Sequence, residues 1–380
     1  MYRMNDPTSQ MKQTIRIFSI LITVLFLFPG CQKVQRDEPG DNKKSVLLDS
    51  DMVESFDDGV AFMIMLGSKE IDIKGLTTVT GNVWAQEALA YGIRIGELCG
   101  GKNLTYIPGA QYPLRAGRLD SLREEIDANP GEDGSYLGAF SYSEVTDWRS
   151  FFTDRYKRQP EIQPSSEEAS EYIARQILSA PGQLTILAIG PCTNIAKALS
   201  VHPEIAAKTK EIIYMGGAVW CKGNTTTYAE LNFLYDPEAA AICLRAPFPK
   251  QTLVSLDVCN TVRMDRQRFL NLYDSIDSED IKKLFRNNYA YQRFEDDPSA
   301  TQLVWDLISA VIAVDPGIIT RYKDVGLDVD DVPDSPTYGK VYETQSPSRQ
   351  IVRVPLQIDQ NRFWDIVFSR VNTTGQHSQR

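Results

Sequence analysis

The chain has 380 residues, of which 42% are apolar and 24% are charged, and both fractions are close to those of globular proteins. They exclude a disordered, collagen-like or low-complexity chain, and the length allows one large domain or two ordinary ones. The 50 acidic residues exceed the 40 basic ones, so the net charge is −10. Nucleic-acid-binding proteins usually carry a basic surface, and we therefore expect no nucleic-acid partner.

Residues 1–31 have the composition of a targeting segment rather than of folded structure. Lys12 and Arg16 stand at the start of a mostly apolar stretch, 17–28, which is too short for a stable bilayer-spanning helix. A small residue then stands directly before Cys31, and this arrangement resembles the lipobox of bacterial lipoproteins, in which the cysteine becomes the lipidated N-terminus. We expect an exported chain tethered to the bacterial cell envelope through Cys31. An ordinary secretory signal with an incidental cysteine is the alternative.

The polar residues 32–44 are predicted to form a tether, residues 45–371 the folded domain, and residues 372–380 a polar tail. Five cysteines lie beyond Cys31, an odd number without CxxC spacing, so neither a zinc site nor a dense disulfide framework is expected. A single disulfide is compatible with an oxidising compartment.

Short apolar runs alternate with amphipathic stretches along the folded domain. Apolar runs with strand composition lie at 45–48, 73–79, 184–189, 212–215 and 252–256. Helical patterns lie at 85–99, 167–179, 194–201, 236–246, 265–275, 278–293 and 304–314. Strands that alternate with helices predict an α/β fold with a mostly parallel central sheet and helices on both faces.

Residues 115–160 differ from the rest of the domain. They hold several Gly, Asp, Glu and Ser residues and few apolar runs. We interpret them as a long excursion that covers a site, and a disordered surface insertion is the alternative.

Polar residues follow the predicted strands at their carboxyl ends, and in an open α/β sheet ligands bind outside these ends. The first strand is followed by several carboxylates, and the later strands by glycine, asparagine or aspartate. In chain order these positions are Asp49, Asp51, Asp57, Asp58, Gly81-Asn82, Gly190, Gly216-Gly217 and Asp257. We therefore expect a functional site at this edge of the sheet.

Five carboxylates fall within the ten residues 49–58. Their mutual repulsion at one strand end is costly unless a cation lies among them, and hard divalent cations prefer carboxylate and carbonyl oxygens. An EF-hand is excluded because the segment lacks the glycine at loop position six and the terminal Glu. A solvated acidic loop without a metal is the alternative.

Two enzyme families have such a segment after the first strand. The segment 49–53, Asp-Ser-Asp-Met-Val, resembles the DxDx(T/V) motif of haloacid-dehalogenase-like phosphatases, in which Asp49 would be the nucleophile and Asp51 the acid–base group. It also resembles the DxD of nucleoside hydrolases, which is closely followed by DDA. One branch of that family has five residues between the two motifs, as this chain has at 52–56, although Gly59 stands where the family usually has Ala.

Motifs later in the chain favour the second family. The Gly-Asn, Ala-Glu-Leu-Asn and Asp-Pro-Glu-Ala-Ala elements within 223–240 are similar to the family's "GN…AEFN…DPEAA" block at the expected spacing. Further motifs resemble its second strand, its "GPLTNIA" and MGG turns, its GLDVT strand and its C-terminal FW helix. They lie at 76–82, 187–196, 214–217, 255–258 and 362–364. Over about 45–370, the chain is identified as a member of the nucleoside hydrolase family.

The resemblance implies a Rossmann-like fold that holds one Ca²⁺ at the strand ends and cleaves the N-glycosidic bond of ribonucleosides. It implies Ca²⁺ ligands at Asp51, Asp58, Asp306 and the backbone carbonyl of Ile189, and Asp51 would also take a proton from the attacking water. Asp49 would lie behind these groups. The implied contacts with the nucleoside are Asp57, Asn82, Met215, Asn224, Glu230, Asn232 and Trp305. The expected partner is a small nucleoside or ribosyl compound, and family members are often homo-oligomers.

The chain departs from the family where the leaving base is protonated. Many members have a His directly before the last metal-binding Asp, and this chain has Trp305 before Asp306. His202 is expected at a helix end or on the surface, and His377 lies in the polar tail. Stacking of Trp305 on the base, or a proton from a tyrosine, could replace the His. The tyrosines considered are Tyr136, Tyr142, Tyr228 and Tyr235.

Two further positions leave alternatives open. Glu54 and Ser55 stand where this branch of the family tends to have Asn-Asp, so the loop is expected to recognise a different hydroxyl pattern. Trp84, close to Asn82, either lines the pocket or packs in the core.

Three functions are compatible with these observations. The first is a Ca²⁺-dependent nucleoside hydrolase. The second is a hydrolase of the same fold that acts on another glycoside or ribosyl conjugate. The third is a lipoprotein that binds a nucleoside or ribose without turnover, although the retained Asp51 argues against it because a binding protein needs no base.

Overall fold

The computed structural model describes residues 43–131 and 136–371. The predicted signal segment with Cys31, nearly all of the predicted tether and the tail with His377 lie outside these residues. In the two described ranges, no helix has the length and apolar character needed to cross a membrane.

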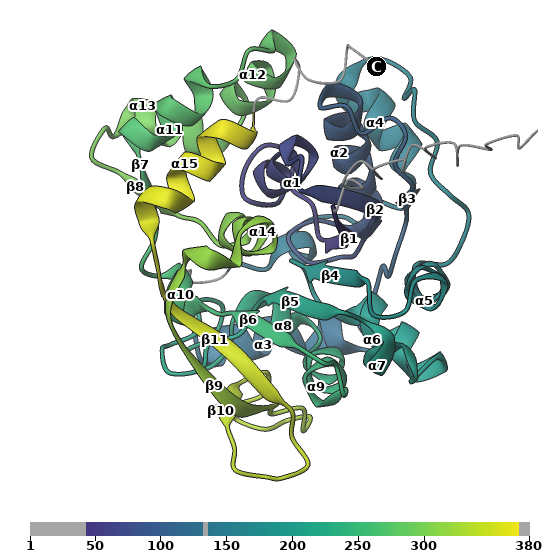
Figure 1. The fold of residues 1–380 in the computed structure, drawn as a ribbon. Helices are drawn as coiled ribbons and strands as arrows, with labels where there is room; N and C mark the ends of the chain where they lie inside the picture. The colour runs from purple at the N-terminus through teal and green to yellow at the C-terminus, as the bar shows by residue number, and fades with distance from the viewer. Residues whose placement is uncertain (1–42, 132–135, 372–380) are drawn as a thin grey trace, which may run out of the picture. The chain divides into compact units, whose positions relative to one another are not determined.

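A nine-stranded sheet in the order β10-β9-β11-β6-β5-β4-β1-β2-β3 forms the centre of the molecule (Figure 1). Neighbouring strands from β3 across to β11 run parallel, whereas β9 and β10 pair antiparallel at one edge. The strands of this sheet are β1 (Lys44–Ser50), β2 (Ile71–Thr78), β3 (Tyr106–Ile107), β4 (Leu184–Ala188), β5 (Glu211–Met215), β6 (Gln251–Val254), β9 (Ile319–Val329), β10 (Val341–Glu343) and β11 (Ile351–Ile358). A separate two-stranded sheet pairs β7 (Arg263–Asp265) with β8 (Thr301–Leu303).

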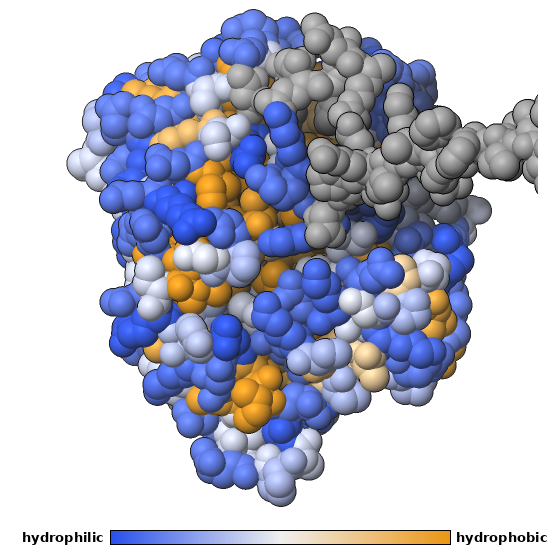
Figure 2. Space-filling view, viewed as in Figure 1, coloured by the Kyte–Doolittle hydropathy of each residue, from blue (hydrophilic) through white to orange (hydrophobic). Residues whose placement is uncertain are grey.

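Helices cover both faces of the large sheet because successive side chains of a strand point to opposite faces. On β1, Val46 and Leu48 belong to one apolar core and Leu47 to the other. The first core includes residues of α1 (Asp58–Gly67), α2 (Ala85–Leu98), α11 (Arg266–Asp274), α12 (Glu279–Arg286), α14 (Asp306–Val314) and α15 (Gln360–Arg370). The second includes residues of α5 (Ala169–Ser179), α6 (Thr193–Val201), α7 (Ile205–Lys208) and α9 (Pro237–Arg245). On the face seen in Figure 2, hydrophilic residues predominate and hydrophobic ones form small separate groups.

The predicted α/β fold with a mostly parallel sheet and helices on both faces is confirmed, and the five predicted strands are present with small shifts at their ends. The strands β9, β10 and β11 were not predicted. Most residues of β9 are exposed or half-buried, so the strand lacks the apolar run that marks a buried parallel strand. These three strands project together at the bottom of Figure 1.

The single helix predicted over 278–293 is wrong, because the structure has two helices there. The first, α12, starts with Ser278 as its N-cap and ends at Arg286, and α13 (Tyr289–Asp296) follows after two asparagines. Asparagine competes for backbone hydrogen bonds and favours helix ends. The strand predicted over 252–256 likewise ends at Val254 and gives way to the short helix α10 (Leu256–Cys259).

The described part of the segment 115–160 contains α3 (Arg118–Ala128), a 3₁₀ turn at Gly138–Ser141, and α4 (Trp148–Tyr156). Leu122 and Ile126 of α3 are buried in a small apolar cluster with Leu234 and Tyr235 of α8 (Leu231–Tyr235). This segment therefore packs on the helix that follows the predicted ribose-binding motif.

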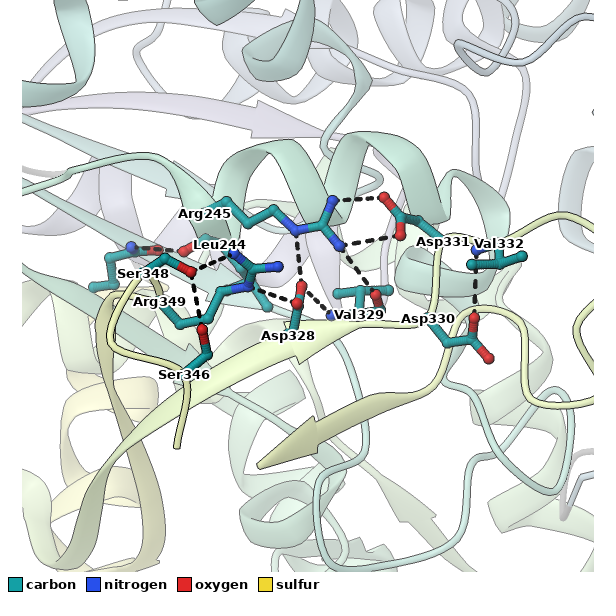
Figure 3. Close-up of polar contacts among 11 residues, drawn as sticks. Leu244, Arg245, Asp328, Val329, Asp330, Asp331, Val332, Ser346, Ser348 and Arg349 are labelled. Carbon is teal, nitrogen blue, oxygen red and sulfur yellow. Dashed lines mark hydrogen bonds and ion pairs between the residues drawn. The ribbon is translucent and has the colours of Figure 1, made fainter. Parts of the chain in front are cut away.

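A buried carboxylate joins the antiparallel strands to α9 (Figure 3). The Oδ1 atom of Asp328 on β9 accepts a hydrogen bond of 2.8 Å from Arg245 Nε at the end of α9, and Oδ2 accepts one from Arg349. Arg245 also pairs with Asp331 at 2.7 Å. Burial alone would raise the pKa of Asp328, but the hydrogen bonds from Arg349 and Arg245 outweigh it and hold the pKa below its usual value.

We expect Asp328→Asn to destabilise the protein by about 1–2 kcal/mol at pH 7, because two charge-assisted hydrogen bonds weaken at a buried position. A carboxylate whose pKa is lowered in the folded state adds stability at pH values above its unfolded-state pKa of about 4. This stability is lost as the pH falls through the folded-state pKa. The difference between the two proteins should therefore shrink below about pH 4 in chemical denaturation.

The matched control is Asp324→Asn on the same strand, whose partner Arg353 and own carboxylate are both partly exposed, at 35% and 42%. Exposed ion pairs contribute little, so this change should cost less than about 0.5 kcal/mol. Equal losses for both variants would contradict the special role of the buried position.

Candidate active site

The loop after β1 places a row of carboxylates at the carboxyl end of the sheet. Asp49 lies on the strand itself and is buried; its Oδ1 accepts hydrogen bonds from Thr77 and from Asn194 Nδ2, the latter at 2.7 Å. Asp51 follows the strand and is completely buried. Its Oδ2 accepts a hydrogen bond of 2.6 Å from the backbone N–H of Asn82. Asp58 begins α1, and its Oδ1 accepts 2.7 Å from the Ser50 hydroxyl.

Asp57 connects this loop to the distant helix α14. Its φ angle of 50° lies in the left-handed region, which is uncommon for residues other than glycine. In this conformation its Oδ1 accepts hydrogen bonds from the backbone N–H groups of Trp305, at 3.1 Å, and Asp306, at 2.9 Å. The N-terminal end of α14 is thereby fixed beside the loop, and Asp306 is brought next to the carboxylates from β1.

Two glycines allow the backbone to approach Asp51 closely. A Cβ atom on Gly81 would lie 2.2 Å from Asp51 Oδ2, and one on Gly190 would lie 2.7 Å from the Asp51 backbone nitrogen. Atoms cannot approach so closely without displacement. The glycines of the Gly-Asn and Gly-Pro motifs are therefore required by the packing around Asp51.

The buried carboxylates at this strand end repel one another. Burial and then repulsion by neighbouring aspartates raise the pKa values of Asp51, Asp58 and Asp306, that of Asp58 to about 7. Because burial and like-charge repulsion both disfavour the charged form, ionisation of all three carboxyl groups at once is costly without a neutralising charge.

The donor set fits a hard divalent cation. Within the described ranges, no three His, Cys, Asp or Glu side chains are already arranged to hold a metal ion. The buried oxygens Asp51 Oδ1, Asp58 Oδ2 and Asn232 Oδ1 nevertheless have no hydrogen-bond partner. Unpartnered buried oxygens are costly, and carboxylate and amide oxygens are the ligands that Ca²⁺ prefers.

The motif residues of 223–240 contribute a second group of polar side chains to the same cavity. Glu230 caps α8, and its carboxylate accepts hydrogen bonds from the backbone N–H groups of Gly217 at 2.8 Å and Asn232 at 2.9 Å. Burial raises the pKa of Glu230 to about 7 although these donors oppose the shift. Asn232 Nδ2 donates to the carbonyl oxygens of Met215, at 3.2 Å, and Ile189, at 3.4 Å. The predicted metal-ligand carbonyl of Ile189 therefore lies next to the amide of Asn232.

These groups surround a partly open cavity of about 680 Å³, a size typical of small-molecule sites. Asp51, Ile189 and Asp49 are buried behind its wall rather than lining it. The predicted residues that line it are Asp57, Asp58, Asn82, Met215, Asn224, Glu230, Asn232, Trp305 and Asp306. The structure therefore brings nine of the predicted site residues to one cavity.

Other cavity residues were missed from the sequence, because they come from segments without a recognised motif. The sequence singled out Glu54 and Ser55 as departures from the family and Tyr136 as a candidate proton donor, and all three line the cavity. The Glu54 carboxylate accepts hydrogen bonds from Arg155, at 2.6 Å, and from Tyr156 of α4. Asn288 Nδ2 donates 3.2 Å to Ser55. The missed lining residues include Tyr91, Arg155, Asn287, Asn288, Arg293 and Gln302.

Several open alternatives are decided by position. Trp84 does not line the cavity and packs edge-on against Tyr112 and Phe140. His202 ends α6, with its ring beside the carboxylates of Glu171 and Glu204 and away from the cavity lining. No disulfide joins any two of the five cysteines among the described residues.

A sequence profile of the inosine-uridine preferring nucleoside hydrolase family matches residues 46–365. The chain belongs to this family. The resemblance drawn from the motifs is thus confirmed, and the phosphatase alternative is set aside.

The alignments with curated relatives cover part of this chain and part of each relative. Uridine nucleosidase 1 of Arabidopsis thaliana is 29% identical over 229 residues, which are 60% of this chain and 61% of the relative. The pyrimidine-specific ribonucleoside hydrolase RihA of Citrobacter koseri is 31% identical over 227 residues, 59% of this chain and 64% of the relative. The chain therefore spans about 60% of the length of the curated relatives it matches.

Solved structures are similar over a larger part of the chain. A plant nucleoside hydrolase aligns with a TM-score of 0.70 at 24% identity and covers 87% of this chain and 99% of that one. The purine-preferring ribonucleoside hydrolase from Gardnerella vaginalis aligns with a TM-score of 0.68 at 22% identity, and the alignment covers 86% of this chain and 98% of that one. These likenesses show that the nucleoside hydrolase fold is shared.

We expect Gly190→Ala to displace Asp51 and to destabilise the protein by about 1–3 kcal/mol, because the added methyl group would lie 2.7 Å from the backbone nitrogen of Asp51 and 2.9 Å from the Val79 side chain. Gly317→Ala is the control, since the atoms nearest to its Cβ would be ends of the Asp315 and Arg362 side chains, at 3.0 Å or more. Thermal unfolding of both variants checks the difference. A Gly190→Ala protein as stable as Gly317→Ala would contradict the close approach at Asp51.

Proposed function

We propose that this chain hydrolyses the N-glycosidic bond of ribonucleosides and releases ribose and the free base. One observation carries the proposal: Asp57, Asp58 and Asp306 line one cavity together with Asn82 and the motif residues of 223–240. The family membership supports the same reaction class, and the names of the relatives, uridine nucleosidase and ribonucleoside hydrolase, agree with it.

Ca²⁺ is the proposed cofactor. Asp51, Asp58, Asp306 and the backbone carbonyl of Ile189 would hold it, since their oxygens are hard ligands and two of the carboxylates keep an unpartnered oxygen. When bound, Ca²⁺ supplies positive charge that lowers the pKa of the attacking water and orients vicinal hydroxyls.

The side chains supply the other steps of the proposed reaction. Asp51 takes a proton from the attacking water, and its position is fixed by the hydrogen bond from the Asn82 N–H. Asp57 accepts a hydrogen bond from a ribose hydroxyl, and Asn224, Glu230 and Asn232 hold the remaining hydroxyls. The surrounding carboxylates stabilise the positive charge that develops on the ribose ring as the bond to the base breaks.

A related hydrolase of another glycoside or ribosyl conjugate is the second candidate. It is favoured by the cavity lining at Glu54 and Ser55, which stand where this family branch tends to have Asn-Asp. The Glu54 carboxylate is held by hydrogen bonds from Arg155 and Tyr156. Different hydroxyl positions in the substrate would suit this different wall.

The test is release of reducing sugar from a panel of purine and pyrimidine nucleosides, with Ca²⁺ and with EDTA. We expect Asp51→Asn to lower kcat by about 10²–10⁴-fold, since it removes the base, and EDTA to abolish release. Asp315→Asn, outside the cavity, is the matched control and should keep activity.

Thermal unfolding with and without Ca²⁺ separates the outcomes. At a free Ca²⁺ concentration 100 times the Kd, binding stabilises the folded protein by about 2.7 kcal/mol. Asp306→Asn should reduce this stabilisation. Ca²⁺ stabilisation without release of sugar from any nucleoside would reject the proposed reaction and favour another glycoside or a binding role.

We further propose that the chain is exported and anchored to the bacterial cell envelope through a lipid on Cys31. The Gly30-Cys31 sequence after the apolar stretch supports this localisation. Radiolabelled palmitate should be incorporated into the full chain produced in bacteria, and membrane fractionation should recover the protein with the envelope. Cys31→Ser should lose both the label and the membrane association, whereas Cys221→Ser should keep both. Label retained by Cys31→Ser would refute the anchor.

A further inference from the structure

A base that leaves an N-glycosidic bond takes the bonding electron pair with it and must gain a proton. Among the described residues that line the cavity, none is a histidine. The guanidinium groups of Arg155 and Arg293 face the cavity, but an arginine pKa exceeds 12 and the group keeps its proton. A phenol, with an ordinary pKa of about 10, can donate one.

The tyrosines near the cavity differ in what their hydroxyl groups contact. Tyr91 lines the cavity, but its hydroxyl donates a hydrogen bond of 2.7 Å to Glu87, and burial and this carboxylate raise the pKa of Tyr91 and make it a weaker acid. Tyr142 donates a hydrogen bond of 2.7 Å to the other oxygen of the same carboxylate and does not line the cavity. Tyr235 is buried and stacks on Phe140. Tyr228 does not line the cavity. Tyr136 remains, since it lines the cavity and its hydroxyl bonds to the uncharged side chain of Asn82, which also lines the cavity.

On the premise of the proposed function, we propose that Tyr136 donates the proton to the departing base. Its hydroxyl donates a hydrogen bond of 3.0 Å to Asn82 Oδ1, and the backbone N–H of Asn82 donates one of 2.6 Å to Asp51 Oδ2. Two hydrogen bonds through Asn82 thus connect the Tyr136 phenol with Asp51, the proposed general base. Trp305 lines the same cavity. Its side chain is 46% exposed in the free protein, and a bound base would cover it.

The proton balance of the step is closed. The bond between C1′ and the base nitrogen breaks, and its electron pair stays with the base, which takes the proton of the Tyr136 hydroxyl. The attacking water gives its oxygen and one hydrogen to C1′ and its other proton to Asp51. Proton exchange with solvent then returns Asp51 and Tyr136 to their starting forms, so that one nucleoside and one water give ribose and base.

The test compares two leaving groups in the full chain with Ca²⁺. The first substrate is the nucleoside that the unmodified protein hydrolyses fastest, and the second is 4-nitrophenyl β-D-ribofuranoside, whose leaving group is stable as an anion. We expect Tyr136→Phe to lower kcat on the nucleoside by about 10²–10⁴-fold and to leave the nitrophenyl substrate within about threefold. Tyr136→His, which keeps a proton donor, should recover part of the lost rate.

Tyr142→Phe is the matched control, because it removes a hydroxyl bonded to Glu87 and should leave both rates unchanged. Equal losses on both substrates for Tyr136→Phe would overturn the proposal, because they would indicate a structural role. Full nucleoside activity of this variant would overturn it as well. If the unmodified protein cleaved neither substrate, the proposed function itself would fail, and this result is distinct from the other two.

Discussion

The burial of several carboxylates at the carboxyl end of β1 is the constraint on which the rest of this site depends. Asp51, Asp57, Asp58 and Asp306 are all buried, and each lies near another carboxylate. Such a cluster is stable only if protons, hydrogen-bond donors or a cation neutralise it. The chain supplies donors from Ser50, from the Asn82 N–H and from the first N–H groups of α14. In the proposed function, Ca²⁺ neutralises the unpartnered oxygens that remain.

This constraint explains why distant parts of the sequence meet here. Asp57 accepts its hydrogen bonds from residues almost 250 positions later, and it adopts a strained backbone conformation to do so. Gly81 and Gly190 let two further loops approach Asp51 to distances that no side chain would permit. The cost of this strain is outweighed only when all of the loops are in place, so the site and the surrounding core depend on one another.

The cavity has two parts of different origin. The inner part is built from the strand ends and from the residues of 223–240, which carry the family motifs. The outer part comes from α4, from the residues between α12 and α13, and from β8, with Arg155, Asn288 and Gln302 as examples. In the proposed function, the inner part holds the ribose and the outer part contacts the leaving base.

The sequence by itself determined the parallel α/β fold, the family and the inner residues of the cavity, because buried strands read as apolar runs and strand ends carry fixed polar motifs. It did not determine the strands β9 to β11, the break at Asn287, or the partners of Glu54. Those features depend on contacts between segments far apart in the chain, and their residues are polar and follow no period. The choice among four tyrosines was of the same kind. Tyr136 lines the cavity and its hydroxyl bonds to Asn82, whereas Tyr142 does not line it and its hydroxyl bonds to Glu87. Tertiary packing rather than any local pattern sets these contacts.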